Sequence, residues 1–113
     1  MKRADLEYAQ GFKVVAGNAR SQAATMVIPP GGKEGSANNK HDGADQWLLV
    51  VKGHGEAVLN GHRYALQPDS LILIEQGDTH EIRNTGSAAM TTLNFYVPPA
   101  YTAKGGETEA GRG

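Results

Sequence analysis

The sequence contains no cysteine, and this absence excludes two kinds of structure. Disulfide bonds and thiolate metal sites cannot form anywhere in the 113 residues. Long apolar runs are missing as well, since the longest falls far short of the roughly 20 residues that a membrane-spanning helix requires. No signal peptide is recognisable at the N-terminus. These absences together predict a cytoplasmic protein with no membrane partner.

An excess of charge of either sign is also lacking. Eleven Lys and Arg residues stand against twelve Asp and Glu residues, for a formal net charge of -1, and the basic residues form no local cluster. A protein that binds nucleic acid needs a basic surface to meet the phosphates, so no nucleic-acid partner is expected. The length predicts a single domain over residues 1–113. Its barrel should cover about 12–100, and the Gly- and Glu-rich tail at 102–113 is expected to lie on the surface or to be disordered.

Helical periodicity is scarce, whereas short strand-like segments recur about every 8 to 12 residues along the chain. Gly, Pro or Asn residues bound most of these segments, as is typical of strands joined by turns. Residues 1–10 are expected to form at most one turn of helix, and residues 33–40 to form a loop. The pattern predicts an all-β fold, either an antiparallel sandwich or a barrel. The predicted strands cover residues 12–15, 22–28, 47–51, 56–59, 62–66, 71–74 and 90–97, with a further strand beginning at His80.

The clearest local signal is the dipeptide Asn60-Gly61, which separates the segments 56–59 and 62–66. Asn and Gly tolerate the positive φ angles that both central residues of a type I′ turn require. The sequence therefore predicts a tight antiparallel hairpin with a two-residue loop.

The apolar run at 47–51 is unusual because its residues do not alternate with polar ones. Alternate side chains of a strand point to opposite faces, so Gln46 and Leu48 should point one way while Trp47 and Leu49 point the other. A strand that is apolar on both faces must be covered on both. We expect the barrel interior to cover one face and a second subunit to cover the other, which predicts a homodimer.

Three side chains with metal-binding atoms converge if these strands form a barrel. His41 and Gln46 come just before the apolar run, and His80 opens a later strand on which His80, Ile82 and Asn84 share one face. Imidazole is the commonest neutral ligand for divalent metals, and a Gln carbonyl oxygen is a weaker one.

The residues around His41 also carry a family resemblance. The pattern Asn39-x-His41-x4-Gln46-x6-Gly53 resembles the first cupin motif, His-x-His-x3-4-Glu-x6-Gly. Asn39 stands where the family has its first His, and Gln46 stands where it has Glu. The chain therefore keeps the spacing of this motif but not its carboxylate.

The second cupin motif, Pro-x-Gly-x2-His-x3-Asn, is similar to Glu75-x-Gly77-x2-His80-x3-Asn84, with Glu75 in place of Pro. The resemblance covers about residues 22–101. It implies a cupin-type double-stranded β-helix, that is, a jelly-roll barrel, usually dimeric and often holding a metal. One fold hosts many functions, so the resemblance does not fix a reaction.

Two functions from different classes remain open at this stage. In the first, His41, Gln46, His80 and Asn39 bind a divalent metal ion of the Zn, Mn, Fe or Ni class, which acts on a small oxygenated substrate. Neutral ligands favour an anionic substrate. In the second, the barrel binds a small-molecule ligand without metal or catalysis. The sequence identifies no catalytic residue and does not decide whether the protein is an enzyme.

The other ionisable residues are expected to lie outside the site. Glu34 is predicted to sit on a loop from which it could reach inward. Asp42 and Asp45 should face away from His41 and Gln46, whereas Glu75, Glu81, His54 and His62 should be exposed to solvent.

Overall fold

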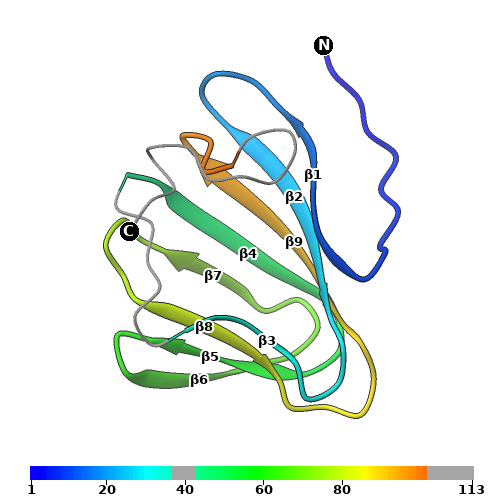
Figure 1. Ribbon diagram of the computed structural model, residues 1–113, viewed down its shortest axis with the longest axis vertical. Coiled ribbons are helices and arrows are strands. Elements are labelled where there is room, and N and C mark those ends of the chain that lie inside the picture. Colours follow the sequence, from blue (N-terminus) through cyan, green and yellow to red (C-terminus); the bar gives the residue numbers. More distant parts are fainter. Residues whose placement is uncertain (37–42, 102–113) are drawn as a thin grey trace.

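The computed structural model describes residues 1–36 and 43–101, and all of the regular structure in these ranges is β-strand (Figure 1). None of the described residues lies in a helix of the length and apolarity needed to cross a membrane. The described ranges contain nine strands: β1 Gly11–Gly17, β2 Gln22–Ile28, β3 Lys33–Ser36, β4 Asp45–Lys52, β5 Gly55–Leu59, β6 His62–Leu66, β7 Leu71–Ile74, β8 His80–Asn84 and β9 Met90–Val97.

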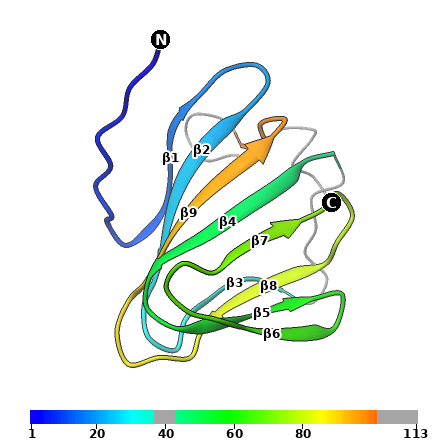
Figure 2. The ribbon, with the colours of Figure 1, turned by 180° about the vertical axis from the view of Figure 1, so that it is seen from behind.

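Two antiparallel sheets make up the fold. The larger sheet has the strand order β1-β2-β9-β4-β7, and the smaller has the order β3-β8-β5-β6. Non-consecutive strands lie side by side in both sheets, as in a jelly roll. Figures 1 and 2 show the sheets as two layers that approach each other where β2 runs into β3 and diverge at the opposite end. The predicted all-β jelly roll is confirmed.

The hydrophobic core lies between the two sheets, and alternation along each strand builds it. Leu48 and Val50 on β4 are completely buried, and Ile82 on β8 is 1% exposed from the opposite sheet. The inward set predicted for the apolar run is therefore confirmed. Met26, Ile28, Ala57, Leu66, Ile74 and Met90 complete this core.

The segment after the Pro-Pro-Gly-Gly turn was predicted to be a loop, and this prediction is wrong for residues 33–36. They form β3, which pairs with β8 from Lys33 opposite Arg83 to Ser36 opposite His80. Small and polar residues have little intrinsic preference for a strand. The backbone hydrogen bonds offered by β8 impose this conformation, and they come from residues almost fifty positions later in the chain.

The predicted hairpin is confirmed in its details. β5 and β6 pair from Gly55 opposite Leu66 to Leu59 opposite His62, which leaves a two-residue loop. Asn60 has a φ angle of 51° and Gly61 one of 82°, both in the left-handed region. These are the residue types that a type I′ turn selects.

Candidate functional site

Gln46 and His80 both point into the barrel, as their strand positions predict. Gln46 on β4 is 3% exposed and His80 on β8 is 5% exposed. The two residues belong to different sheets, but each stands at the beginning of its strand. These beginnings lie at the same end of the barrel, on the left in Figure 1.

A hydrogen bond ties the segment before His80 to the beginning of β4. The backbone N–H of Gln76 donates to Oδ1 of Asp45, at an N···O distance of 3.0 Å. Asp45 precedes Gln46 and points away from the interior, so its carboxylate is available to the turn at residues 75–79. Asp45, which was expected to lie outside the site, thus helps to position the strand that carries His80.

Asn60 holds the same turn from the other side. Its Nδ2 donates to Oδ1 of Asp78 at 2.8 Å, and its Oδ1 accepts from the backbone N–H of Thr79 at 3.0 Å. The hairpin loop is therefore docked against the residues that lead into His80. Sequence reasoning gave Asn60 only a role in its own turn, because nothing local in the sequence reveals a contact with residues 78 and 79.

Gln46 carries the most informative polar atom of the site. Its Nε2 donates to Oδ1 of Asn94 on β9 at 3.0 Å, whereas its Oε1 is buried and has no hydrogen-bond partner within residues 1–36 and 43–101. A buried acceptor without a donor costs free energy, so it calls for an explanation. Asn94 was missed at the sequence level. The signal was present, since Thr92, Asn94 and Tyr96 are polar side chains at alternate positions of a strand.

The imidazole of His80 is oriented by the turn before it. Nδ1 lies 3.5 Å from the backbone oxygen of Asp78. A carbonyl oxygen only accepts, so this contact favours the tautomer with the proton on Nδ1. Nε2 then carries the lone pair, which is the form of imidazole that binds a divalent metal.

Glu34 was predicted to lie on a loop, but it stands on β3 opposite Ile82. Paired residues of neighbouring strands share a face, and Ile82 is part of the core, so Glu34 lies on the interior side of its sheet. It remains exposed to solvent there. Desolvation raises the pKa of Glu34 above its ordinary value of 4.5. Burial raises the pKa of Tyr96 well above 10, with smaller contributions from Tyr101 and Glu34, so its hydroxyl stays protonated.

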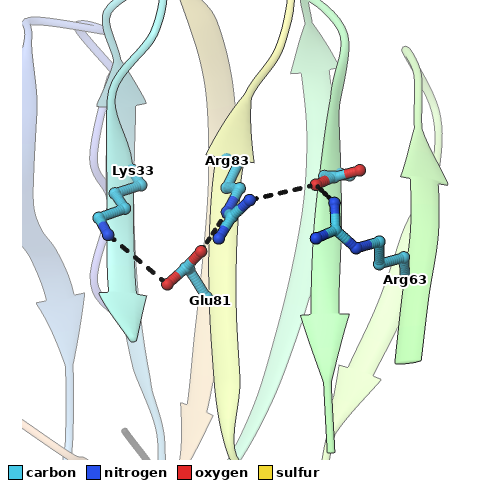
Figure 3. A network of polar contacts seen from close by, with 5 residues as sticks. Lys33, Arg63, Glu81 and Arg83 are labelled. Atoms are coloured by element: carbon cyan, nitrogen blue, oxygen red, sulfur yellow. Dashed lines mark hydrogen bonds and ion pairs between the residues drawn. The ribbon is translucent and has the colours of Figure 1, made fainter. Parts of the chain in front are cut away.

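Glu81 corrects a second expectation. It points outward as predicted, but it is 4% exposed instead of solvated. Lys33 lies 3.9 Å from its carboxylate, and Arg83 donates a hydrogen bond to it. Arg83 also lies 3.7 Å from Glu56, which in turn lies 3.0 Å from Arg63. Figure 3 shows the resulting charge ladder, formed by Lys33, Glu56, Arg63, Glu81 and Arg83, across the outer face of the smaller sheet.

Asn39, His41 and Asp42 lie outside the described residues. Within residues 1–36 and 43–101, no group of three or more His, Cys, Asp or Glu side chains could hold a metal ion. Glu75, His54 and His62 are exposed, as predicted. Of the four predicted metal ligands, the structure places Gln46 and His80 inside the barrel, and all four stay predictions as ligands.

Known proteins resemble most of this chain. A family model described as a cupin domain matches residues 24–96, which are more than half of the chain. A search of curated protein sequences gives no match.

Solved structures share the fold. A Bacillus halodurans protein is 24% identical with a TM-score of 0.76, and the match covers 88% of this chain and 76% of that one. KdgF from Halomonas sp. is 22% identical with a TM-score of 0.71, over 78% and 77% of the two chains. A predicted oxalate decarboxylase from Thermotoga maritima is 22% identical with a TM-score of 0.70, over 78% and 79%. These likenesses concern the fold, and together with the family match they lead to one conclusion: this chain belongs to the cupin family.

Proposed function

We propose that this protein is a small-molecule-binding cupin that coordinates a divalent metal ion inside its barrel. Gln46 and His80 would be two of the ligands, and the spacing of the first motif adds His41 and Asn39. The observation that carries the proposal is the buried Oε1 of Gln46, which no donor meets in the part of the chain that the structure describes. It lies on the end of the barrel where His80 is also buried.

The residues fit a divalent ion of the Zn, Mn, Fe or Ni class. A cation satisfies a buried carbonyl oxygen that has no donor among the residues described, and the imidazole of a histidine such as His80 is the commonest neutral ligand for such an ion. All four proposed ligands are neutral, so they leave the charge of the ion uncompensated. A small anionic ligand, such as one with a carboxylate or an enediolate, would supply the missing negative charge.

A metal ion bound there would polarise a carbonyl or hydroxyl oxygen of the substrate. The protein's own part is to hold the ion and to orient the ligand. Glu34 is the carboxylate that strand register directs toward the interior side, which makes it a candidate proton acceptor.

The test begins with elemental analysis of protein purified without a metal-affinity tag, followed by calorimetric titration of the apo protein with Zn2+. We expect about one bound ion per chain, and we expect His80→Ala and His41→Ala to abolish binding. His62→Ala is the matched control, because His62 is exposed on β6 and should not contribute. If both histidine variants bind Zn2+ like the control, the metal site is wrong.

Gln46→Glu gives the sharper prediction. A carboxylate at position 46 would neutralise half of the ion's charge at contact distance, so the variant should bind Zn2+ more tightly than the parent. The same titration measures the difference. The carboxylate would also face Oδ1 of Asn94, which accepts from Gln46 in the parent. Unchanged affinity in a variant that is as stable to urea as the parent would show that residue 46 does not contact the ion.

A non-catalytic barrel without metal is the second candidate. The observation that favours it is that the described residues supply no cluster of three ionisable metal ligands. This candidate predicts that elemental analysis finds no bound metal and that the protein does not bind added Zn2+. The group that donates to Oε1 of Gln46 would then be an O–H or N–H of an organic ligand.

A further inference from the structure

A chain of buried hydrogen bonds leads from the backbone of β2 to the side chain of Gln46. The hydroxyl of Thr92 donates to the backbone oxygen of Met26 at 2.8 Å. Nδ2 of Asn94 donates to Oγ1 of Thr92 at 3.0 Å, and Nε2 of Gln46 donates to Oδ1 of Asn94 at 3.0 Å. Thr92 and Asn94 are completely buried, so water does not compete for these bonds.

The backbone oxygen of Met26 sets the direction of this chain. A carbonyl oxygen cannot donate, and the hydroxyl of Thr92 has a single hydrogen, which is used on Met26. Thr92 must therefore accept from Asn94, so the amide nitrogen of Asn94 faces Thr92 and its oxygen faces Gln46. That oxygen requires a donor. Gln46 supplies one only when its Nε2 faces Asn94, which leaves its Oε1 on the side of the barrel interior.

The reversed arrangement is unfavourable for a specific reason. If Gln46 presented its nitrogen to the interior, the side-chain amide of Asn94 would have to flip. The hydroxyl of Thr92 would then have to donate to the amide oxygen of Asn94. The oxygens of Thr92 and Met26 would then face each other as two acceptors 2.8 Å apart, with no hydrogen between them. The chain therefore has one favourable direction.

We infer that Thr92 and Asn94 are positioning residues that lock Gln46 as a hydrogen-bond acceptor toward the barrel interior, so that its subsite selects a cation and rejects an anion. The inference rests on the metal-binding function proposed above and identifies how residue 46 contributes to it. It also restricts where the substrate binds. Oε1 of Gln46 repels an anionic group of the substrate, so that group must bind at another position around the ion.

Thr92→Val tests the chain, and Thr25→Val is its matched control. Both threonines are buried in the larger sheet, on the adjacent strands β9 and β2. The hydroxyl of Thr25, however, has no hydrogen-bond partner among the described residues, so it orients no amide. Val at position 92 removes the group that orients Asn94, so both amides can adopt either orientation. If the two orientations are equally populated, half of the molecules oppose a cation and the apparent affinity falls about twofold.

The readout is calorimetric titration of each apo protein with Co2+, accompanied by the visible absorption spectrum of the bound ion. We expect Thr92→Val to bind more weakly than the parent, and Thr25→Val and Thr92→Ser to bind like it, since Ser keeps the hydroxyl. Equal affinity of Thr92→Val and Thr25→Val would overturn the inference while leaving the proposed metal site intact. Absence of Co2+ binding by the parent overturns the metal site instead.

Neutron diffraction from a deuterated crystal of the parent protein tests the chain without any metal and without any variant that must fold. We expect deuterium on Thr92 directed at the oxygen of Met26, and the two deuterium atoms of the Asn94 amide on the side of Thr92. An Asn94 amide with its deuterium atoms toward Gln46 would refute the proposed direction.

Discussion

Asn84 shows how one side chain can serve the fold while belonging to the family motif. Its Nδ2 donates to the backbone oxygens of Ile28 at 2.9 Å and Ala88 at 2.8 Å, and its Oδ1 accepts from the N–H of Gly86 at 2.9 Å. It thus ties the end of β8 to the end of β2 and to its own turn. The residue lies inside the barrel, but it is saturated by backbone groups and has no role in the candidate site.

Asn84→Asp should destabilise the protein strongly. The amide nitrogen of Asn84 donates to two buried carbonyl oxygens, whereas the ionised carboxylate of Asp has no hydrogen to donate. Losing both hydrogen bonds should lower the free energy of unfolding by roughly 2 kcal/mol or more. Urea denaturation measures the loss. Asn18→Asp is the matched control, since only the Oδ1 of Asn18 is used, accepting from Arg20 and Ser21. Equal stability of the two variants would contradict this account.

Glu81 gives a prediction about pH. The hydrogen bond from Arg83 lowers the pKa of Glu81 below its ordinary value of 4.5, and the charges of Arg83 and Lys33 act in the same direction. The unfolded chain therefore takes up this proton more readily than the folded one. The stabilisation from Glu81 is complete above the unfolded pKa, and it is lost as pH falls through the lower folded pKa.

Glu81→Gln should accordingly be less stable than the parent near neutral pH, and its stability should fall less between about pH 6 and about pH 3. Urea denaturation across this range gives the two slopes. Glu75→Gln is the control, because Glu75 is exposed in a turn. A parent and a Glu81→Gln variant with parallel pH profiles would show that the ladder contributes nothing through this carboxylate.

Among the elements, the β5–β6 hairpin has the most local origin. Gly61 has a φ angle of 82°, and a Cβ added there would meet no atom within 4 Å. Crowding therefore does not explain the glycine, and only the positive φ angle does. The neighbouring Asn60 has a second task, because it fastens the turn before His80.

Gly61→Val should destabilise the protein by about 1 kcal/mol or more, because a β-branched residue resists the left-handed conformation. Thermal and urea denaturation measure this loss. Gly61→Asn is the control, since Asn tolerates a positive φ angle and should lose less. A Val variant as stable as the Asn variant would show that the turn is not type I′, and a helical circular-dichroism spectrum of the parent would end the all-β account.

At the scale of the whole molecule, the outer faces of the two sheets differ in chemistry. The charge ladder lies on the smaller sheet, whereas the larger sheet exposes apolar side chains from neighbouring strands. Trp47 on β4 is directly paired with Phe95 on β9, and the two are 40% and 41% exposed. Val97 and Leu71 are also largely exposed on this side. An apolar surface of this kind favours contact with another protein surface.

We predict that the larger sheet forms the interface of a homodimer, in which a second copy covers Trp47 and Phe95. Phe95→Lys should then shift the protein toward monomer at micromolar concentration, as measured by analytical ultracentrifugation. Tyr64→Lys is the matched control, because Tyr64 is also an exposed aromatic residue, on β6 of the other sheet. A parent protein that sediments as a monomer at high micromolar concentration would contradict the prediction.

The sequence alone determined the features that depend on near neighbours. Alternation within 46–51 and 80–84 identified the inward set, and Asn60-Gly61 identified the hairpin, because φ preferences and the two-residue period of a strand act over a few residues. The spacing of the two motifs identified the family, since it preserves the positions of side chains on strands.

Only the tertiary structure decided features that depend on residues far apart in the chain. Residues 33–36 became β3 because β8 offered them hydrogen bonds, and Glu81 became buried because Lys33 and Arg83 lie beside it. The direction of the Gln46 amide is set through Asn94 and Thr92 by the backbone of β2. Hydrogen-bond partners across a sheet are chosen by register, and register is a property of the folded chain that no local run of residues contains.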